Sequence, residues 1–405
     1  MVDALFVAGF GMTSFQPHHG DATVADLARA AIASALDDAD VTAAEIDELV
    51  FANESDHLSR QVTLAAMVQT DSGLCERPLM RVEAGGATGA VAVRAAAALL
   101  RAGEAGAVIV CGAEKTGRDV PSSLASEIFA MSADVDLEFP VGLTFPALYA
   151  MMLQTHTELY GTTMDQVATV AVKNFRNGAN NALAHRGGSI TVDDVRSSPA
   201  VASPYRAYDC SVLSDGAAAI VLATSEWMRK HGSTDRPAVA LVGTGSATAP
   251  ARLGDRLTHG KANLANFSAK RRAATAAYEQ AGVVEPSQDI DVAEVYDSFT
   301  GVEIQACEDL GFCDTGTGGP SAASGRFDFG GDVVVNPSGG LIARGAASGA
   351  TGLAQIAEIT AQLRGDATGR QVDGATRGLT DTHAGVGSIS VVHVFEQRPS
   401  FKVAS

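Results

Sequence analysis

The stretch NPSGGLIARGAASGATGLAQIAEITAQLRG, residues 336–365, holds a glycine turn, GATG, that leads straight into a long apolar segment. The same four residues stand at 86–89, 263 positions earlier (349 − 86), and they also lead into an apolar segment. Apolar residues at helical spacing behind such a turn predict a helix, and glycine at its start lets other backbone approach closely. Two copies of this arrangement suggest a duplicated fold.

Further matches keep the same order around the two turns. The segments VAGFG (7–11) and ALVGTG (240–245) share a Gly-x-Gly pattern, and GAAAIVLATSE (216–226) matches GSISVVHVFEQ (387–397). The spacing is far longer than the roughly 20–50 residues of solenoid repeats. We therefore interpret the chain as one duplicated unit rather than a repeat array.

Buried strands and amphipathic helices alternate along the chain, whose two halves we place at 1–230 and 231–405. The segments ALFVAG (4–9) and GAVIVCG (106–112) are apolar on both faces, as strands covered by helices are. Between them, residues 23–38 place apolar side chains on one helical face. The sequence therefore predicts an α/β fold in which helices cover a sheet.

An insertion at roughly 115–210 separates the last two strands of the first half. It contains a helix start at Thr163, where Thr163 and Gln166 have the spacing of a capping box. Insertions of this kind lie over the ends of a sheet, where binding sites are usually built. We expect this insertion to cover the functional site.

The composition narrows the classes of function. The 405 residues carry a net charge of −18, which argues against general nucleic-acid binding. The five cysteines are scattered without zinc spacing, so we expect no metal site, no disulfides and a cytoplasmic location. The chain has no signal-peptide pattern and no apolar run of membrane length, so membrane association is not expected. The GGATG turn lacks GxGxxG spacing, which disfavours a nucleotide-dependent oxidoreductase.

Three blocks carry a resemblance to a known family. The segments DCSVLSDGAAAIVLA (209–223), EVYDSFTGVEIQACEDLGFC (294–313) and 336–365 resemble the thiolase superfamily, and are most similar to its sterol-carrier-protein-type thiolases and thiolase-like proteins. The resemblance runs along the whole chain. It implies the thiolase fold, in which two five-stranded α/β halves form a five-layer α/β/α/β/α core. It also implies a homodimer and an acyl-coenzyme A substrate, with no other cofactor.

The catalytic positions of that family are altered here. Gly86 stands where thiolases carry the nucleophilic cysteine at a helix start, where the helix N-terminus lowers the thiol pKa. Ala346 stands where the family's Gly-His-Pro block has its histidine, and His383-Ala384-Gly385 replaces the Cys-x-Gly motif. Tyr296 begins the block that replaces the family's Asn-Glu-Ala-Phe or His-Asp-x-Phe. Thiolysis and Claisen condensation through a cysteine are therefore disfavoured.

The altered pattern is similar to the thiolase-like aldolases of steroid side-chain degradation. That likeness implies retro-aldol cleavage of a β-hydroxyacyl-CoA, with the N–H groups of Gly86 and Gly385 as an oxyanion hole for the enolate. Tyr296 and His383 are the available acid/base groups. The likeness also implies a partner protein with an OB fold and a zinc ribbon, and a steroid side-chain thioester as substrate.

Several other residues are candidates for substrate contact. Asp297, Ala346 and Ser348 are near the altered motifs, although Asp297 could instead hold a loop backbone. Lys270 and Arg271 belong to the densest basic cluster, which also contains Arg272 and is preceded by Lys261. This cluster suits the phosphates of coenzyme A, but a charge run is more often a solvated helix face.

Three functional hypotheses follow. The first is a cysteine-less lyase that cleaves a β-hydroxyacyl-CoA. The second is a non-catalytic thiolase-like subunit that binds acyl-CoA beside an active partner. The third is an acyltransferase in which a relocated cysteine or serine reaches Gly86.

Overall fold

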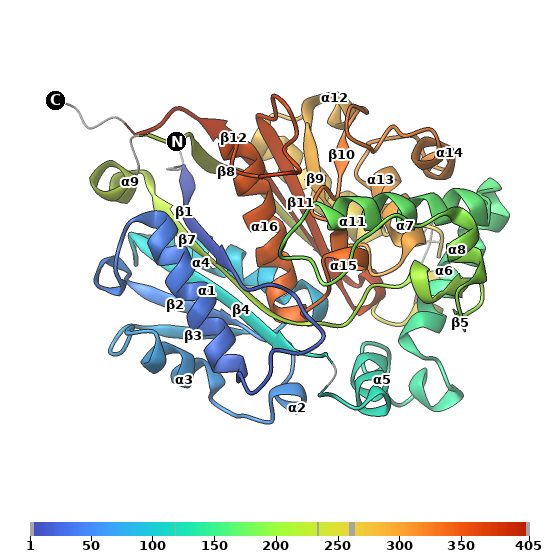
Figure 1. The fold of residues 1–405 in the computed structure, drawn as a ribbon, viewed down its shortest axis with the longest axis horizontal. Helices are drawn as coiled ribbons and strands as arrows, with labels where there is room; N and C mark the ends of the chain where they lie inside the picture. The colour runs from blue at the N-terminus through green and yellow to red at the C-terminus, as the bar shows by residue number, and fades with distance from the viewer. Residues whose placement is uncertain (1–3, 118, 233–234, 259–263, 402–405) are drawn as a thin grey trace.

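A computed structural model describes residues 4–117, 119–232, 235–258 and 264–401. Its centre is a ten-stranded sheet in the order β10-β9-β11-β12-β8-β1-β7-β4-β2-β3 (Figure 1). The strands are β1 (Leu5–Met12), β2 (Glu48–Ala52), β3 (Leu79–Val82), β4 (Ala107–Lys115), β7 (Asp215–Thr224), β8 (Ala238–Thr248), β9 (Val292–Glu294), β10 (Val334–Val335), β11 (Arg377–Ala384) and β12 (Ile389–Arg398). Two short strands, β5 (Ala200–Ala202) and β6 (Tyr205–Arg206), pair separately.

The sheet repeats one topology on each side of its middle. Read outward, the first half runs β1, β7, β4, β2, β3 and the second runs β8, β12, β11, β9, β10. In each half the two outermost pairings are parallel and the inner ones antiparallel. The halves join where Leu5, Phe6 and Val7 of β1 pair with β8. The predicted duplicated α/β fold is confirmed.

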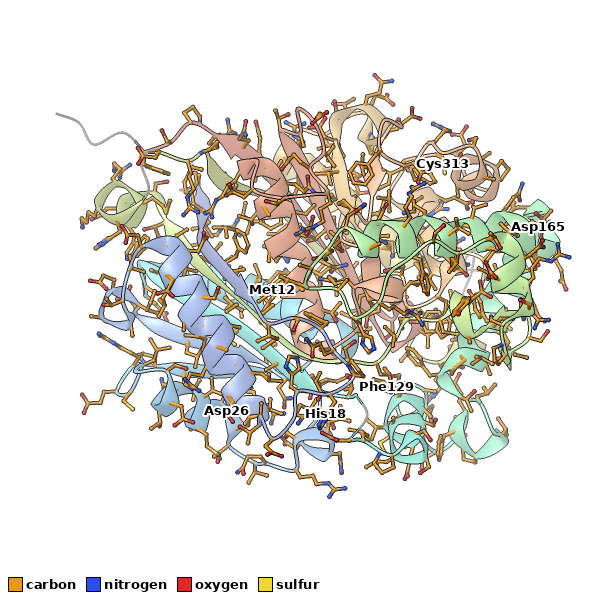
Figure 2. The ribbon with its side chains drawn as sticks, in the orientation of Figure 1. Met12, His18, Asp26, Phe129, Asp165 and Cys313 are labelled. Carbon is orange, nitrogen blue, oxygen red and sulfur yellow. The ribbon has the colours of Figure 1, made fainter. Side chains whose placement is uncertain are left out.

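Helices form three layers around the two halves of the sheet. Helix α1 (Val24–Ala39) covers the outer face of the first half, and α11 (Ser268–Ala281) covers that of the second. Between the halves lie α4 (Thr88–Ala102) and α16 (Ser348–Arg364), which follow the two glycine turns. Every residue of α16 is buried. Side chains fill the space between these layers (Figure 2).

The two strands predicted from apolar runs extend further than expected. The first continues to Met12 and the second to Lys115, because both ends still pair with β7. Glu114 stays in β4 although it is buried, since Asn53 and the Glu54 N–H donate hydrogen bonds to its carboxylate.

The insertion lies between β4 and β7 and packs against the second half (Figure 1). The predicted helix start at Thr163 is present, with the Gln166 N–H donating to the Thr163 hydroxyl at 3.3 Å. Its helices are α5 (Ser122–Ala130), α6 (Phe145–Tyr160), α7 (Met164–Ala179) and α8 (Val192–Ser197). Outside it lie α2 (Asp56–Ser59), α3 (Leu64–Asp71), α9 (Ser225–His231), α10 (Leu253–Thr258), α12 (Pro286–Asp289), α13 (Thr300–Asp309), α14 (Gly318–Ala323) and α15 (Gly340–Ala343). Across the described ranges, no helix combines the length and apolarity that a membrane crossing requires.

Candidate active site

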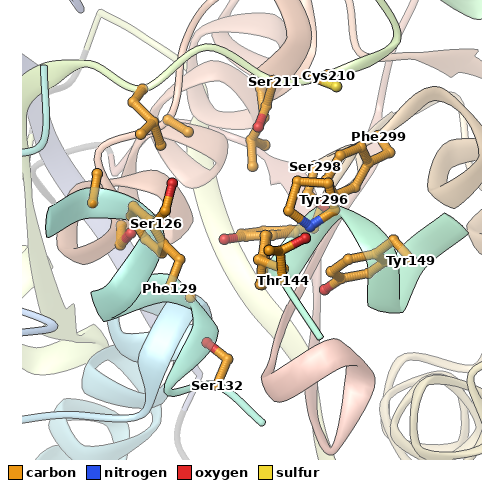
Figure 3. Close-up of a pocket in the computed structure, with 18 of the residues that line it drawn as sticks. Ser126, Phe129, Ser132, Thr144, Tyr149, Cys210, Ser211, Tyr296, Ser298 and Phe299 are labelled. Carbon is orange, nitrogen blue, oxygen red and sulfur yellow. The ribbon is translucent and has the colours of Figure 1, made fainter. Parts of the chain in front are cut away.

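A cavity of about 380 Å³ lies where the starts of α4 and α16 meet the insertion. Helices α5 and α6 and the segment after β9 complete its walls (Figure 3). Its lining is mainly apolar and includes the rings of Phe129, Phe145, Tyr149, Tyr296 and Phe299. The structure brings the four residues predicted for catalysis and for the oxyanion hole to this one cavity: Gly86, Tyr296, His383 and Gly385.

The first glycine turn forms one wall of the cavity and leaves no room for a side chain. Residues Gly85–Ala87 make a short 3₁₀ turn directly before α4. A Cβ atom at Gly86 would lie 2.3 Å from the Tyr296 hydroxyl oxygen and 2.9 Å from the His383 carbonyl oxygen. The first N–H groups of a helix lack intrahelical acceptors, so this turn can offer donors to a ligand oxygen.

Two tyrosines flank His383 in the cavity. The rings of Tyr296 and His383 have centroids 4.6 Å apart. The Tyr149 hydroxyl, from α6 of the insertion, shares a hydrogen bond of 2.9 Å with Nε2 of His383. The other ring nitrogen, Nδ1, is buried and has no hydrogen-bond partner among the described residues. Tyr296 lies between Phe129 and Tyr149 in Figure 3.

Burial sets the protonation of these groups. It raises the pKa of Tyr296 well above the ordinary value, with the Glu54 carboxylate adding to the shift. Burial likewise raises the pKa of Tyr149. It lowers the pKa of His383 well below the ordinary value, and the charges of Lys270 and Arg256 lower it further. At neutral pH the tyrosines are therefore protonated hydrogen-bond donors, and the imidazole is neutral.

Glu54 is a cavity residue that the sequence analysis missed. It follows the carboxyl end of β2, and it lines the cavity beside Ser348. Burial raises its pKa to about 7; the Ser348 hydroxyl opposes this shift, and the Glu83 carboxylate adds to it. A glutamate two residues after a buried strand, at the end where sites are built, is the signal that could have found it.

The other predicted contacts divide into two groups. Ala346 and Ser348 line the cavity, and their contact with substrate stays a prediction. Asp297 does not line it: its buried carboxylate accepts from the Leu341 N–H at 2.6 Å and from Asn174 at 2.7 Å. Asp297 therefore holds the start of α15 and lies outside the lining of the cavity. This corrects its assignment as a binding residue.

The basic cluster also has structural roles. Lys270 is fully buried in α11, and its ammonium pairs with the buried carboxylate of Asp381. It therefore presents no charge to a ligand at the surface, which corrects the expected contact. Arg271 is partly exposed but bound to Asp309 and Thr315, and it does not line the cavity. Lys261 lies outside the described residues.

One thiol reaches the cavity. Cys210 lines it from the end of the insertion (Figure 3), and its thiol donates to the Arg206 carbonyl oxygen at 3.2 Å. Burial raises the pKa of Cys210 to about 12, with the Asp209 carboxylate adding to the shift, so the thiolate is scarce at neutral pH. Cys210 escaped the sequence analysis because only the folded insertion brings it beside the cavity.

Comparison with known proteins agrees with this architecture. The family description "Thiolase, N-terminal domain" matches residues 5–226, and "Thiolase C-terminal domain-like" matches 254–397. The chain belongs to the thiolase family. Its relatives include the "Acetyl-CoA acetyltransferase" of Methanothermobacter thermautotrophicus, which is 38% identical over 93% of this chain and 95% of the relative. The "Sterol carrier protein 2" of Oryctolagus cuniculus is 32% identical over 97% of this thiolase-family chain and 72% of its own length.

A solved structure described as "Ltp2-ChsH2(DUF35) aldolase" also resembles this thiolase-family protein. It aligns with a TM-score of 0.80 and 25% identity, over 96% of this chain and 97% of the other. The thiolase family therefore holds relatives named as acetyltransferases and a structural neighbour named as an aldolase.

Proposed function

We propose that this thiolase-family protein is an acyl-CoA carbon–carbon lyase that cleaves a β-hydroxyacyl-CoA by a retro-aldol reaction. One observation carries the proposal: the turn that should hold a nucleophile has Gly86, and Tyr296 occupies the space of any side chain there. Because glycine has no side chain, this turn supplies no nucleophile for covalent catalysis. A non-covalent reaction through an enolate needs only donors for the thioester oxygen and a group that moves one proton.

The cavity offers both requirements. The N–H groups of Gly86 and Gly385 would hold the thioester oxygen as charge develops on it, and glycine permits close approach. Tyr296 and the hydrogen-bonded pair of Tyr149 and His383 supply donors around the reacting carbons. The mainly apolar lining suits a bulky hydrocarbon group, for which we propose a steroid side chain.

The proposed enzyme is a homodimer that works with an OB-fold partner. Exposed apolar side chains between α5 and α6 support a docking surface at the cavity mouth, since Phe129 and Ser132 of the same region line the cavity. These exposed side chains are Met131, Val135, Leu137, Phe139 and Val141. The aldolase neighbour carries a two-part name, which agrees with a complex of two chains.

The test is ketone or aldehyde release from β-hydroxyacyl-CoAs, followed by mass spectrometry, with steroid and simple acyl groups compared. The Tyr296→Phe variant removes a donor from the cavity, and we expect cleavage to fall about 10²-fold or more. Tyr278→Phe is a matched control, because that hydroxyl bonds the Leu310 carbonyl away from the cavity. Tight acyl-CoA binding without any cleavage would favour the non-catalytic subunit instead.

A second candidate function is acyl transfer from Cys210. It is favoured by the position of this thiol in the cavity and by the relatives named acetyl-CoA acetyltransferase. The high pKa of Cys210 disfavours it. Intact-mass measurement after incubation with acyl-CoA separates the two candidates, because only acyl transfer leaves a covalent adduct.

A further inference from the structure

We infer that Glu54 is the group that takes the proton from the β-hydroxyl and returns it to the enolate carbon. This inference rests on the proposed retro-aldol function and assigns its proton transfer to one residue. Among the described residues that line the cavity, Glu54 is the only carboxylate, and no lysine or arginine is present. A group at this place can reach a substrate held against the glycine turn.

The backbone of Glu54 is held by a hydrogen bond, while one of its side-chain oxygens has no hydrogen-bond partner among the described residues. Its backbone N–H donates to Glu114 at 2.7 Å, and the neighbouring Asn53 donates to the same carboxylate at 2.6 Å. Arg81 in turn donates to Asn53 at 2.9 Å. The Oε2 atom of Glu54 is buried and has no hydrogen-bond partner among the described residues, while the nearby Ser348 hydroxyl lowers the pKa of the carboxyl. A buried carboxylate oxygen is costly to leave unbonded, so it is suited to accept a proton from a ligand.

Glu54 also lies beside the proposed oxyanion site. Its Oε1 atom is 3.9 Å from the place of a Cβ on Gly85, the first residue of the turn. Its charge acts on Tyr296, which touches Gly86 from the other side. A thioester oxygen bound at the turn would therefore bring the substrate's α and β carbons between Glu54 and Tyr296.

The tyrosines and the histidine that line the cavity are poorly suited to take a proton from the substrate at neutral pH. Tyr296 and Tyr149 hold their protons, because burial raises the pKa of each hydroxyl. His383 is a weak base, because burial and two cations lower its pKa, and its Nε2 already bonds Tyr149. Glu54, with a pKa of about 7, is both a stronger base than an ordinary carboxylate and substantially ionised. Such matching favours proton transfer in both directions.

The proposed step balances without an added reactant. The Glu54 carboxylate takes the β-hydroxyl proton, and the electrons of that O–H bond form the carbonyl of the departing ketone or aldehyde. The Cα–Cβ bond breaks, and its electron pair becomes the enolate of the shorter acyl-CoA. The Glu54 carboxylic acid then gives its proton to Cα. The same group starts and ends as a carboxylate, so neither oxidant nor cofactor is consumed.

The experiment measures two reactions in the full chain, purified with any partner that accompanies it. The first is cleavage of β-hydroxyacyl-CoAs. The second is exchange of the α-hydrogens of a saturated acyl-CoA with D₂O, which needs the base and the enolate but no bond cleavage. We expect Glu54→Gln to lower both about 10²- to 10⁴-fold. The exposed Glu104→Gln is the matched control and should keep both rates.

The pH profile supplies a second readout. The base must be ionised for cleavage, so kcat/KM should rise with pH and level off above about 7. In Glu54→Asp, kcat/KM should be lower but should still rise with pH. In Glu54→Gln, kcat/KM should no longer rise with pH. Acyl-CoA binding by calorimetry and the unfolding midpoint confirm that each variant is folded.

The outcomes separate this inference from the proposed function. Cleavage and exchange that persist in Glu54→Gln would overturn the role of Glu54 and leave the lyase intact. Exchange without cleavage in the native protein, lost in Glu54→Gln, would overturn the lyase and support the role of Glu54 in proton transfer. A native protein that binds acyl-CoA but shows neither reaction would overturn both.

Discussion

The two GATG turns share their sequence and differ in what faces them. At the start of α4, Gly86 meets the hydroxyl of Tyr296 and borders the cavity. At the start of α16, a Cβ on Gly349 would lie 2.6 Å from the Ala52 carbonyl oxygen, inside the helix–sheet packing. Gly86 of the first copy therefore borders the cavity, whereas Gly349 of the second copy is packed in the core, although its neighbour Ser348 lines the same cavity. The environment that the rest of the fold provides, rather than the motif, decides the role.

The largest effect in this comparison is expected from Gly86→Ala. Its methyl group would displace the Tyr296 hydroxyl and the proposed oxyanion donors, so cleavage should fall about 10²- to 10³-fold. The closest obstacle is the end of a side chain, which can move, and the His383 carbonyl oxygen at 2.9 Å is the one backbone atom as near, so the urea midpoint should fall less than in Gly349→Ala. Cleavage kinetics and urea unfolding measure the two effects. A variant with native kcat/KM would show that the turn is not the oxyanion site.

Gly349→Ala should show the opposite pattern. Its methyl group would meet the backbone of β2 and the Glu114 carboxylate, neither of which can yield easily. Overpacking of this kind costs about 1–3 kcal/mol of unfolding free energy. We expect a lower urea midpoint and a smaller fall in the cleavage rate per folded molecule than in Gly86→Ala, because Glu114 Oε2 also accepts from the Glu54 N–H. A cleavage rate that fell as much as in Gly86→Ala would mean that both glycine turns act in catalysis, and the proposed difference between them would be wrong.

The sequence predicted the fold because the duplication is visible in the chain itself. Strands that are apolar on both faces and two matching glycine turns define the layers without any tertiary information. The sequence could place Gly86, Tyr296, His383 and Gly385 together because each stands at the position of a catalytic motif of the family. Their arrangement around one cavity follows from the duplicated topology.

The contacts made through folding could not be predicted in the same way. Lys270 belongs to a run of charges that suggests a solvated face, yet its partner Asp381 lies 111 residues further along the chain. Glu54 and Tyr149 carry no motif. Tyr149 belongs to the insertion, and the importance of both residues comes from burial and from neighbours distant in sequence. A pKa near neutrality is a property of such surroundings, so the sequence alone did not reveal it.

The smallest effect concerns the insertion, whose helix α6 supplies Tyr149 to the cavity. Tyr149→Phe removes the hydroxyl that bonds Nε2 of His383, and it leaves the ring packing against Phe145 and Phe299 in place. Loss of one hydrogen bond between neutral groups is worth about 0.5–1.5 kcal/mol, so we expect a fall in kcat/KM of up to about tenfold. The pH at which kcat/KM levels off should stay unchanged, because the Tyr149 hydroxyl is not among the groups that shift the pKa of Glu54.

Tyr160→Phe, at the far end of α6 and outside the cavity, is the matched control. A fall in kcat/KM as large as that of Gly86→Ala would mean that the Tyr149–His383 pair moves the proton itself. The insertion would then supply a catalytic group, Tyr149, as well as part of the cavity wall. The difference between the two turns would then come from the Tyr149–His383 pair, which lines the same cavity as Gly86.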